Sequence, residues 1–192
     1  QVISPNGELM AWESMEREGY EADKIRLYVM DLTTGEKNDF SEGFDQNAEG
    51  LKWGDDNTIW FISDWHATDE IYSLDIPTGR ITKHTDGVHN YTSVIPTGKM
   101  LLATKVSMSK PAEIYKVDPA TGKDEELSFV NKPILDQLTM GKVEKRWIKT
   151  TDNKDMLVWM IYPPHFDPNR KYPAILYCEG GPQSTVSQFW SY

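Results

Sequence analysis

The sequence predicts a mainly β chain in which three repeated units of about four short strands precede a region of different pattern. Two observations carry this prediction: a ten-residue phrase occurs three times, and it is lost after residue 130. Short runs of Tyr, Ile, Val and Leu between turn-forming residues favour strands over helices in both regions.

The repeated phrase reads aliphatic-Tyr-x-apolar-Asp-x-x-Thr-Gly and spans residues 27–36, 71–80 and 114–123. Successive copies lie 44 and 43 residues apart. The Asp side chain can accept a hydrogen bond from the backbone two residues on, and the Gly supplies the positive φ that closes a hairpin. We therefore expect hairpin turns at residues 34–35, 78–79 and 121–122.

A more apolar strand is expected before each copy of the phrase, at residues 9–12, 58–62 and 100–104. A turn and a further short strand precede each of these. Four short antiparallel strands in a repeat of this length are typical of a β-propeller blade. Residues 1–130 are thus predicted to form three four-stranded blades of a partial propeller, since complete propellers have about four to eight.

The pattern changes after Val130. Residues 131–144 read as a linker with a short helical turn. Strands are then expected at residues 145–150, 156–162 and 172–178, and the last of them ends in Glu179-Gly180-Gly181-Pro182.

Two segments of this second region resemble the start of the catalytic domain in the prolyl oligopeptidase family. They are Ile-Tyr-Pro-Pro-His-Phe-Asp-Pro-Asn-Arg-Lys-Tyr-Pro at residues 161–173 and Tyr-Cys-Glu-Gly-Gly-Pro-Gln-Ser at 177–184. The likeness is greatest to bacterial dipeptidyl-peptidase V-like and acylaminoacyl-peptidase-like members. It implies that residues 145–192 are the first strands of a truncated α/β-hydrolase domain that follows the last propeller blades.

The resemblance implies a segment of a serine exopeptidase that releases dipeptides or acylated residues from short peptides. The family uses Ser-His-Asp acyl transfer, with the propeller as a substrate filter, and its Ser, Asp and His follow in that order further along the chain. No Gly-x-Ser-x-Gly occurs in these 192 residues. The catalytic triad is therefore expected outside this chain, and the chain alone is expected to be inactive.

The resemblance also implies candidate site residues in the Gly-Gly-Pro loop. The backbone N–H of Gly181 is the candidate donor to the oxyanion, since glycine lets the backbone approach the substrate carbonyl. Glu179 stands where the family usually has His or Tyr, and its carboxylate cannot donate to an oxyanion. Its candidate role is to bind a cation or the amino end of a substrate.

Other chemistry-bearing residues favour structural roles. Ser184 precedes Thr185-x-x-Gln188, which fits a capping box, so a helix start is expected there rather than a nucleophile. The four histidines, at positions 66, 84, 89 and 165, are expected to be structural or solvated. Their spacing with the single cysteine, Cys178, predicts no metal site, and no cofactor is implied.

In the first repeat, residues 16–24 form an insertion. It is either a solvated hairpin loop or a loop that reaches toward a neighbour or the substrate cavity. The segment Gly-Tyr-Glu-Ala-Asp-Lys within it recurs in the propellers that the chain resembles.

The formal net charge of −10 argues against a nucleic-acid partner or an anionic membrane surface. The family resemblance favours a periplasmic or secreted bacterial protein acting on short peptides. Three blades cannot close a ring, so we expect exposed apolar faces and self-association of this chain. The alternative function is a non-catalytic, TolB-like propeller that binds a protein or a glycan.

Overall fold

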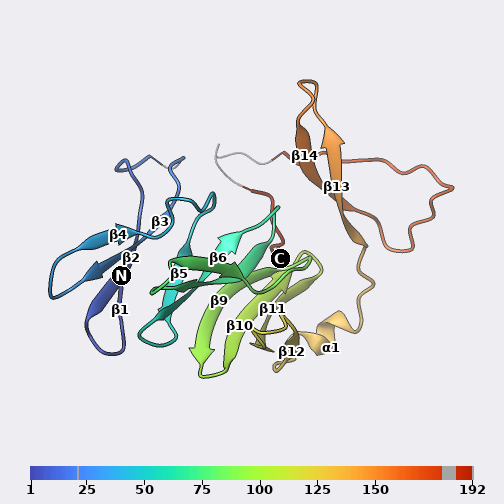
Figure 1. The fold of residues 1–192 in the computed structure, drawn as a ribbon. Helices are drawn as coiled ribbons and strands as arrows, with labels where there is room; N and C mark the ends of the chain where they lie inside the picture. The colour runs from blue at the N-terminus through green and yellow to red at the C-terminus, as the bar shows by residue number, and fades with distance from the viewer. Residues whose placement is uncertain (21, 179–184, 192) are drawn as a thin grey trace.

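The computed structural model describes residues 1–20, 22–178 and 185–191, and these residues form an almost entirely β chain (Figure 1). The strands are β1 (Val2–Ile3), β2 (Leu9–Ser14), β3 (Arg26–Asp31), β4 (Lys37–Asp39), β5 (Glu49–Trp53), β6 (Thr58–Asp64), β7 (Asp69–Asp75), β8 (Arg80–Lys83), β9 (Asn90–Thr97), β10 (Met100–Ser107), β11 (Lys110–Val117), β12 (Asp124–Glu126), β13 (Val143–Lys149) and β14 (Asp155–Ile161). The described residues include a single helix, α1 (Lys132–Leu135), at the predicted helical turn.

The first twelve strands form three antiparallel groups, which we call the first (β1–β4), second (β5–β8) and third (β9–β12) units. For these units, prediction and structure differ in how the sheets are joined. The second and third units are not separate sheets, because a parallel pair between Asp69 and Asn90 joins β7 to β9 in one eight-stranded sheet. The Asn90 carboxamide oxygen accepts the backbone N–H of Asp69 at 3.1 Å, which holds the two strand starts together. No sheet closes on itself among the described residues.

The three predicted Thr-Gly hairpins are confirmed. Gly35, Gly79 and Gly122 have φ values of 75°, 67° and 69°. In each case the glycine N–H donates to the carbonyl of the phrase's Asp at 2.8 Å. The Asp carboxylate also accepts a backbone N–H within the turn. The repeated phrase therefore makes the same turn three times for the same local reason.

A second repeated feature, which was not predicted from the sequence, stabilises the end of each unit. A hydroxyl oxygen accepts the backbone N–H of the residue 14 positions earlier, at the start of the phrase. The pairs are Ser41 with Leu27 at 2.9 Å, Thr85 with Ile71 at 2.9 Å, and Ser128 with Ile114 at 2.8 Å. We call each pair a hydroxyl latch.

Each latch hydroxyl also donates to a carboxylate. In the second and third units the carboxylates are Glu70 and Glu113, which are 0% and 3% exposed. In the first unit Asp39 takes this role. Burial raises the pKa of Glu113, but hydrogen bonds from Ser128 and from the backbone N–H of Asn131 outweigh it, and the pKa lies below its ordinary value. The carboxylate of Glu113 is therefore held ionised within the fold.

Two hydrophobic cores lie between the units and share the second unit. The core between the first and second units contains Leu27 and Val29 from one side and Phe61, Tyr72 and Leu74 from the other. The core between the second and third units is built from Ile71, with Trp60 and Ile62 packed against it, and from a set on the third unit that includes Tyr91, Leu101, Tyr115 and Val117. Consecutive residues of β7, Ile71 and Tyr72, thus face opposite neighbouring units, because successive side chains of a strand point to opposite faces of the sheet.

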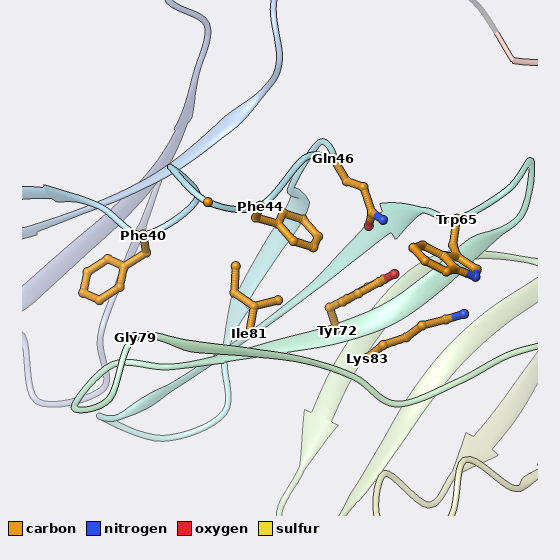
Figure 2. Close-up of a pocket in the computed structure, with 9 residues that line it drawn as sticks. Phe40, Phe44, Gln46, Trp65, Tyr72, Gly79, Ile81 and Lys83 are labelled. Carbon is orange, nitrogen blue, oxygen red and sulfur yellow. The ribbon is translucent and has the colours of Figure 1, made fainter.

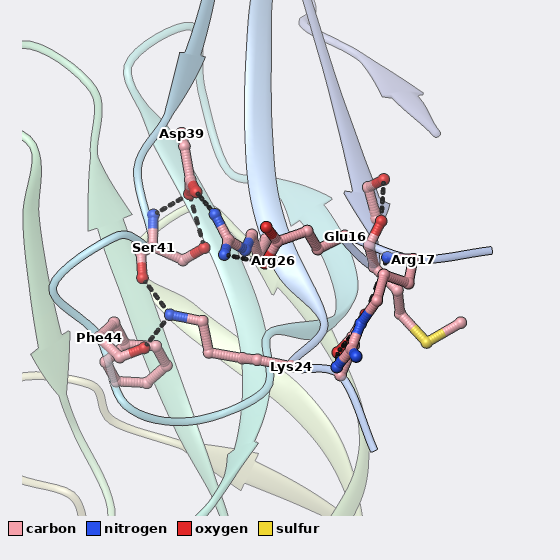
Figure 3. A network of polar contacts seen from close by, with 10 residues as sticks. Glu16, Arg17, Lys24, Arg26, Asp39, Ser41 and Phe44 are labelled. Carbon is pink, nitrogen blue, oxygen red and sulfur yellow. Dashed lines mark hydrogen bonds and ion pairs between the residues drawn. The ribbon is translucent and has the colours of Figure 1, made fainter. Parts of the chain in front are cut away.

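The insertion in the first unit is a solvated loop whose base is fastened to its own unit (Figure 3). Residues 16–20 are exposed. The Lys24 ammonium donates to the carbonyls of Ser41 and Phe44, each at 2.7 Å. Arg26 pairs with Glu16 at 2.9 Å. The solvated-loop interpretation therefore holds for residues 16–20, while the base of the loop positions the segment around residue 44.

After α1 the chain forms the predicted β13–β14 hairpin, which stands apart from the three units in Figure 1. The strand predicted at residues 172–178 is wrong: residues 172–178 form no strand. Ile175 and Leu176 are 96% and 86% exposed, because no strand in the described part of the chain lies beside them. An apolar run becomes a strand only where a neighbour can pair with its backbone.

The helix expected to start near residue 185 is also absent, because residues 185–191 are irregular. They lie against the third unit instead of forming a helical turn. Gln188, which the capping-box prediction assigned to the first turn, is only 1% exposed, and its carboxamide oxygen accepts the N–H of Met108 at 3.2 Å. A tertiary contact therefore takes the side chain that a capping box needs.

Candidate functional site

The candidate site lies where the second unit, the third unit and residues 185–191 meet. Asn90 connects all three. Its carboxamide oxygen accepts the N–H groups of Asp69 and Gln188, at 3.1 and 3.2 Å, and its amide nitrogen donates to Ser187 at 2.8 Å. From the other side, the indole N–H of Trp159 donates to the Val186 carbonyl at 2.8 Å. The residues that follow the Gly-Gly-Pro loop are thus fixed beside the start of β7.

A tight hairpin between β6 and β7 forms one wall of this site. Its two central residues, His66 and Ala67, have φ values of 50° and 61°, as a two-residue hairpin with both central φ values positive requires. Trp65 and Thr68 close the turn by exchanging backbone hydrogen bonds. The left-handed conformation costs Ala67 about 1 kcal/mol, so surrounding contacts must hold it. The His66 ring meets Trp147 of β13 edge to face, with centroids 5.2 Å apart.

Three carboxylates gather at the base of this hairpin. Asp64 and Asp69 are opposite each other across the β6–β7 pair, and Glu49 lies at the start of β5. Partial burial and the charges of Asp64 and Glu49 raise the pKa of Asp69 to about 7. Partial burial, followed by the charges of Asp64 and Glu13, raises the pKa of Glu49 as well. The carboxylates of the cluster therefore repel one another, and binding of a cation or a proton would reduce this repulsion.

The raised pKa of Asp69 predicts a pH-dependent stability. Between the ordinary pKa of 3.8 and the folded value of about 7, the folded state binds more protons than the unfolded state. The free energy of unfolding must therefore fall as the pH rises through this window and level off above it. After allowance for solvent screening, we expect a loss of about 1–2 kcal/mol between pH 5 and pH 8.

Urea denaturation at several pH values tests this expectation. The Asp69→Asn variant should flatten the profile, whereas Asp45→Asn, at an exposed position outside the cluster, should leave it unchanged. A wild-type stability that rises from pH 5 to pH 8 would contradict the assignment.

The structure describes some, but not all, of the candidate residues named from the sequence. Gly181, Glu179 and Ser184 lie outside the described residues. His84 bridges two units: one ring nitrogen is 2.7 Å from the Ser73 hydroxyl and the other is 2.8 Å from the Pro119 carbonyl. His84 is therefore structural, as expected.

The expectation for His66 was incomplete. Although it lies in a hairpin turn, that turn is the wall of the candidate site. The sequence signal was the pair of Asp residues at positions 64 and 69, which a two-residue turn brings face to face.

An open pocket of about 600 Å³ lies on the other side of the same hairpin, between the first and second units (Figure 2). Phe40 and Phe44 line it from the first unit, and Tyr72, Ile81 and Trp65 line it from the second. Burial raises the pKa of Tyr72 to about 12, so its hydroxyl stays protonated at neutral pH. The pocket is an aromatic crevice between units, and Lys83 also lines it, with its ammonium 4.7 Å from the centre of the Trp65 ring.

Neither a metal site nor a membrane-spanning helix is found among residues 1–20, 22–178 and 185–191. These residues contain no group of three or more His, Cys, Asp or Glu arranged to hold a metal ion. The one helix within them has four residues, so none is long and apolar enough to cross a membrane.

Two solved structures share the fold of this chain over most or all of its length. The whole chain superposes on 29% of the acylaminoacyl peptidase of Pyrococcus horikoshii, with a TM-score of 0.79 and 19% identity. Two thirds of the chain matches the β-propeller domain of the Trilobed protease from Pyrococcus furiosus, with a TM-score of 0.53, 20% identity and 37% of that chain covered. At these identities the likeness concerns the fold alone.

Two relatives match nearly the whole sequence of this chain. The chain is 45% identical over 191 residues to dipeptidyl-peptidase 5 of Porphyromonas gingivalis, covering 99% of this chain and 28% of that protein. It is 26% identical over 199 residues to dipeptidyl-peptidase 5 of Arthroderma benhamiae, covering 99% of this chain and 27% of that protein. No family model matches the sequence. The chain spans less than a third of these relatives, and as a partial chain it fits the prolyl oligopeptidase family that its motifs resemble.

Proposed function

We propose that this chain is a segment of a serine exopeptidase that removes dipeptides from the free amino end of short peptides. In this proposal the three units are propeller blades that filter substrates by size, and residues 145–192 belong to the start of an α/β-hydrolase domain. The Ser, Asp and His of the triad lie outside the chain. The relatives named dipeptidyl-peptidase 5 support the reaction class.

The observation that carries the proposal is the place of the carboxylate cluster. An enzyme that cleaves after the second residue from a free amino end needs a fixed negative group that binds the terminal ammonium. Asp69 and Gln188 donate to the same oxygen of Asn90, so the cluster lies beside the residues that follow the Gly-Gly-Pro loop. We propose that a bound substrate places its free amino end at this cluster.

The cluster also favours one of the two exopeptidase classes. An acylated amino end carries no positive charge, so it would leave the negative charges of Asp64 and Asp69 without a counter-charge. A free ammonium would relieve their mutual repulsion and lower the raised pKa of Asp69. We therefore place dipeptide release ahead of acylaminoacyl release.

Two residues of the loop keep their proposed roles. The Gly181 N–H is the proposed donor to the oxyanion. Glu179 is proposed to add a further carboxylate for the substrate's amino end. The rival function is a binding propeller without catalysis. It does not account for the matches to peptidases, because these extend beyond the three units and include residues 145–192.

Peptidase assays test the proposal at the level of the segment. The purified chain should not hydrolyse dipeptidyl or acylaminoacyl chromogenic substrates, because it lacks a nucleophile and a base. The longer protein that contains it should hydrolyse them and lose activity to a serine-directed inhibitor. If the purified chain hydrolysed these substrates even after a serine-directed inhibitor had blocked any contaminating peptidase, the assignment of the triad would be overturned.

A further inference from the structure

The aromatic crevice between the first and second units has both of its walls within this chain. Phe40 and Phe44 come from the segment that follows β4, whereas Tyr72 and Ile81 come from β7 and β8. Its volume of about 600 Å³ suits a small ligand, since such sites are lined mainly by apolar side chains and by a few polar groups. The crevice is therefore a feature of the contact between two complete units.

The walls of the crevice are fixed by contacts within the protein. The Lys24 ammonium donates to the carbonyl of Phe44 at 2.7 Å, which holds the first-unit wall (Figure 3). The Phe44 ring meets the Tyr72 ring edge to face, with centroids 5.5 Å apart. The Ser63 hydroxyl donates to the carboxamide oxygen of Gln46 at 3.1 Å. A ligand would therefore find the crevice already formed and would lose little free energy in ordering it.

The crevice has a polar end and an apolar end (Figure 2). The Tyr72 hydroxyl, the Gln46 carboxamide and the Lys83 ammonium lie at the polar end, whereas Phe40 and Ile81 lie toward the other end. Because the Gln46 oxygen already accepts a hydrogen bond, these three side chains all offer donors there. A fitting ligand therefore needs an acceptor beside the polar end and an apolar group beyond it.

Tyr72 provides the observation that points to a ligand. The residue lines the crevice but is only 4% exposed, and its hydroxyl makes no hydrogen bond of good geometry with any described residue. Burial raises the pKa of Tyr72 to about 12 and outweighs the nearby Gln46 carboxamide, which lowers it. The hydroxyl therefore keeps its proton at neutral pH. A buried donor without an acceptor is destabilising, and an acceptor on a ligand would remove that cost.

The charges around the polar end favour a neutral acceptor over a carboxylate. The Lys83 ammonium is already paired with Asp86 at 2.6 Å. The negative charges of Glu70, Asp86 and Asp64 add to the effect of burial on the pKa of Tyr72, so its hydroxyl lies in a negative field. This field would repel a carboxylate, whereas a peptide carbonyl accepts a hydrogen bond and brings no charge.

We propose that the aromatic crevice binds an aromatic or large aliphatic side chain of a peptide, whose own backbone carbonyl accepts a hydrogen bond from the Tyr72 hydroxyl. The side chain packs against Phe40, Phe44 and Ile81, and the backbone lies beside Trp65 at the polar end. The inference uses only the contact between the first two units and does not depend on the proposed peptidase function.

Fluorine NMR on the longer protein that contains this chain tests the proposal. The probe is N-acetyl-4-fluorophenylalaninamide, which offers a ring and two carbonyls and carries no charge. A covalent serine-directed inhibitor is added first, so that binding at a peptidase site does not interfere. The probe should bind with a Kd of about 0.1–1 mM, as expected for a ligand of this size. The matching carboxylate, N-acetyl-4-fluorophenylalanine, should bind at least about 10-fold more weakly because of the negative field.

Two substitutions locate the binding in the crevice. Tyr72→Phe keeps the ring and removes the donor, so it should weaken binding about 10-fold without lowering the midpoint of thermal unfolding. Tyr28→Phe is the matched control, because it makes the same change at the equivalent position of the first phrase and should leave binding unchanged. Gly43→Leu should abolish binding, since Gly43 lines the crevice and a Cβ there meets no atom within 4 Å.

Three results would overturn the proposal. The first is binding of the probe by the isolated chain but not by the longer protein, which would show that another part of the longer protein occupies the crevice, or binding by neither. The second is binding that neither Tyr72→Phe nor Gly43→Leu weakens. The third is binding of the carboxylate as tight as that of the amide, which would exclude a neutral ligand class.

Discussion

Replacing Thr85 by valine should lower the free energy of unfolding of this chain by about 2–4 kcal/mol. The Thr85 hydroxyl accepts the N–H of Ile71 at 2.9 Å and donates to the carboxylate of Glu70 at 2.6 Å. Ile71 and Glu70 are both fully buried, so water cannot replace either bond. Valine fills the same volume but leaves a buried N–H and a buried carboxylate each short of a partner.

Urea denaturation of three variants isolates this effect. Thr82→Val is the matched control, because Thr82 is exposed on β8 and lies three residues before the latch. It should change stability by less than about 0.5 kcal/mol. Thr85→Ser keeps the hydroxyl and should recover most of the loss. Equal stability of the Thr85→Val and Thr82→Val variants would show that the hydroxyl latch contributes nothing.

Replacing Asp69 by asparagine in the longer protein should lower kcat/KM for substrates with a free amino end by about 100-fold. That factor corresponds to about 2.7 kcal/mol, the scale of a lost charge-assisted hydrogen bond. The same substrates with an acetylated amino end should lose little, because they offer the cluster no charge. Because removing one of the crowded carboxylates should stabilise the fold at neutral pH, a loss of activity would not reflect unfolding.

Asp45→Asn is the control for this second prediction, since Asp45 is exposed and outside the cluster. A pH profile adds an independent readout. In the wild type, binding of the free amino end should strengthen as the pH rises toward 7, because Asp69 loses its proton there. An equal loss for free and acetylated substrates would contradict the proposed role.

Local pattern was enough to predict most strands and turns. The Asp-x-x-Thr-Gly phrase specifies its hairpin through bonds within a few residues, so the turns at Gly35, Gly79 and Gly122 could be placed in advance. The strand expected at residues 172–178 failed for the opposite reason. A strand depends on a partner, and apolar composition does not reveal whether one is present.

The candidate site was harder to predict than the fold. Asp64 and Asp69 face each other across a short turn, which the sequence could have suggested. Glu49 joins them only through the pairing of β5 with β6, and Gln188 reaches Asn90 across 98 positions. The latch hydroxyls carried a visible signal, since Ser41, Thr85 and Ser128 recur with the spacing of the phrase, but the bond each one makes is evident only in the fold.

The central claim is that this chain belongs to an enzyme that removes dipeptides from a free amino end. Mass spectrometry of the products that the longer protein forms from an unblocked apolar peptide and from its acetylated form tests this most directly. We expect successive dipeptides from the unblocked peptide and almost none from the acetylated one. Release of acetylated residues, internal cleavage of both peptides, or no cleavage of either would contradict it.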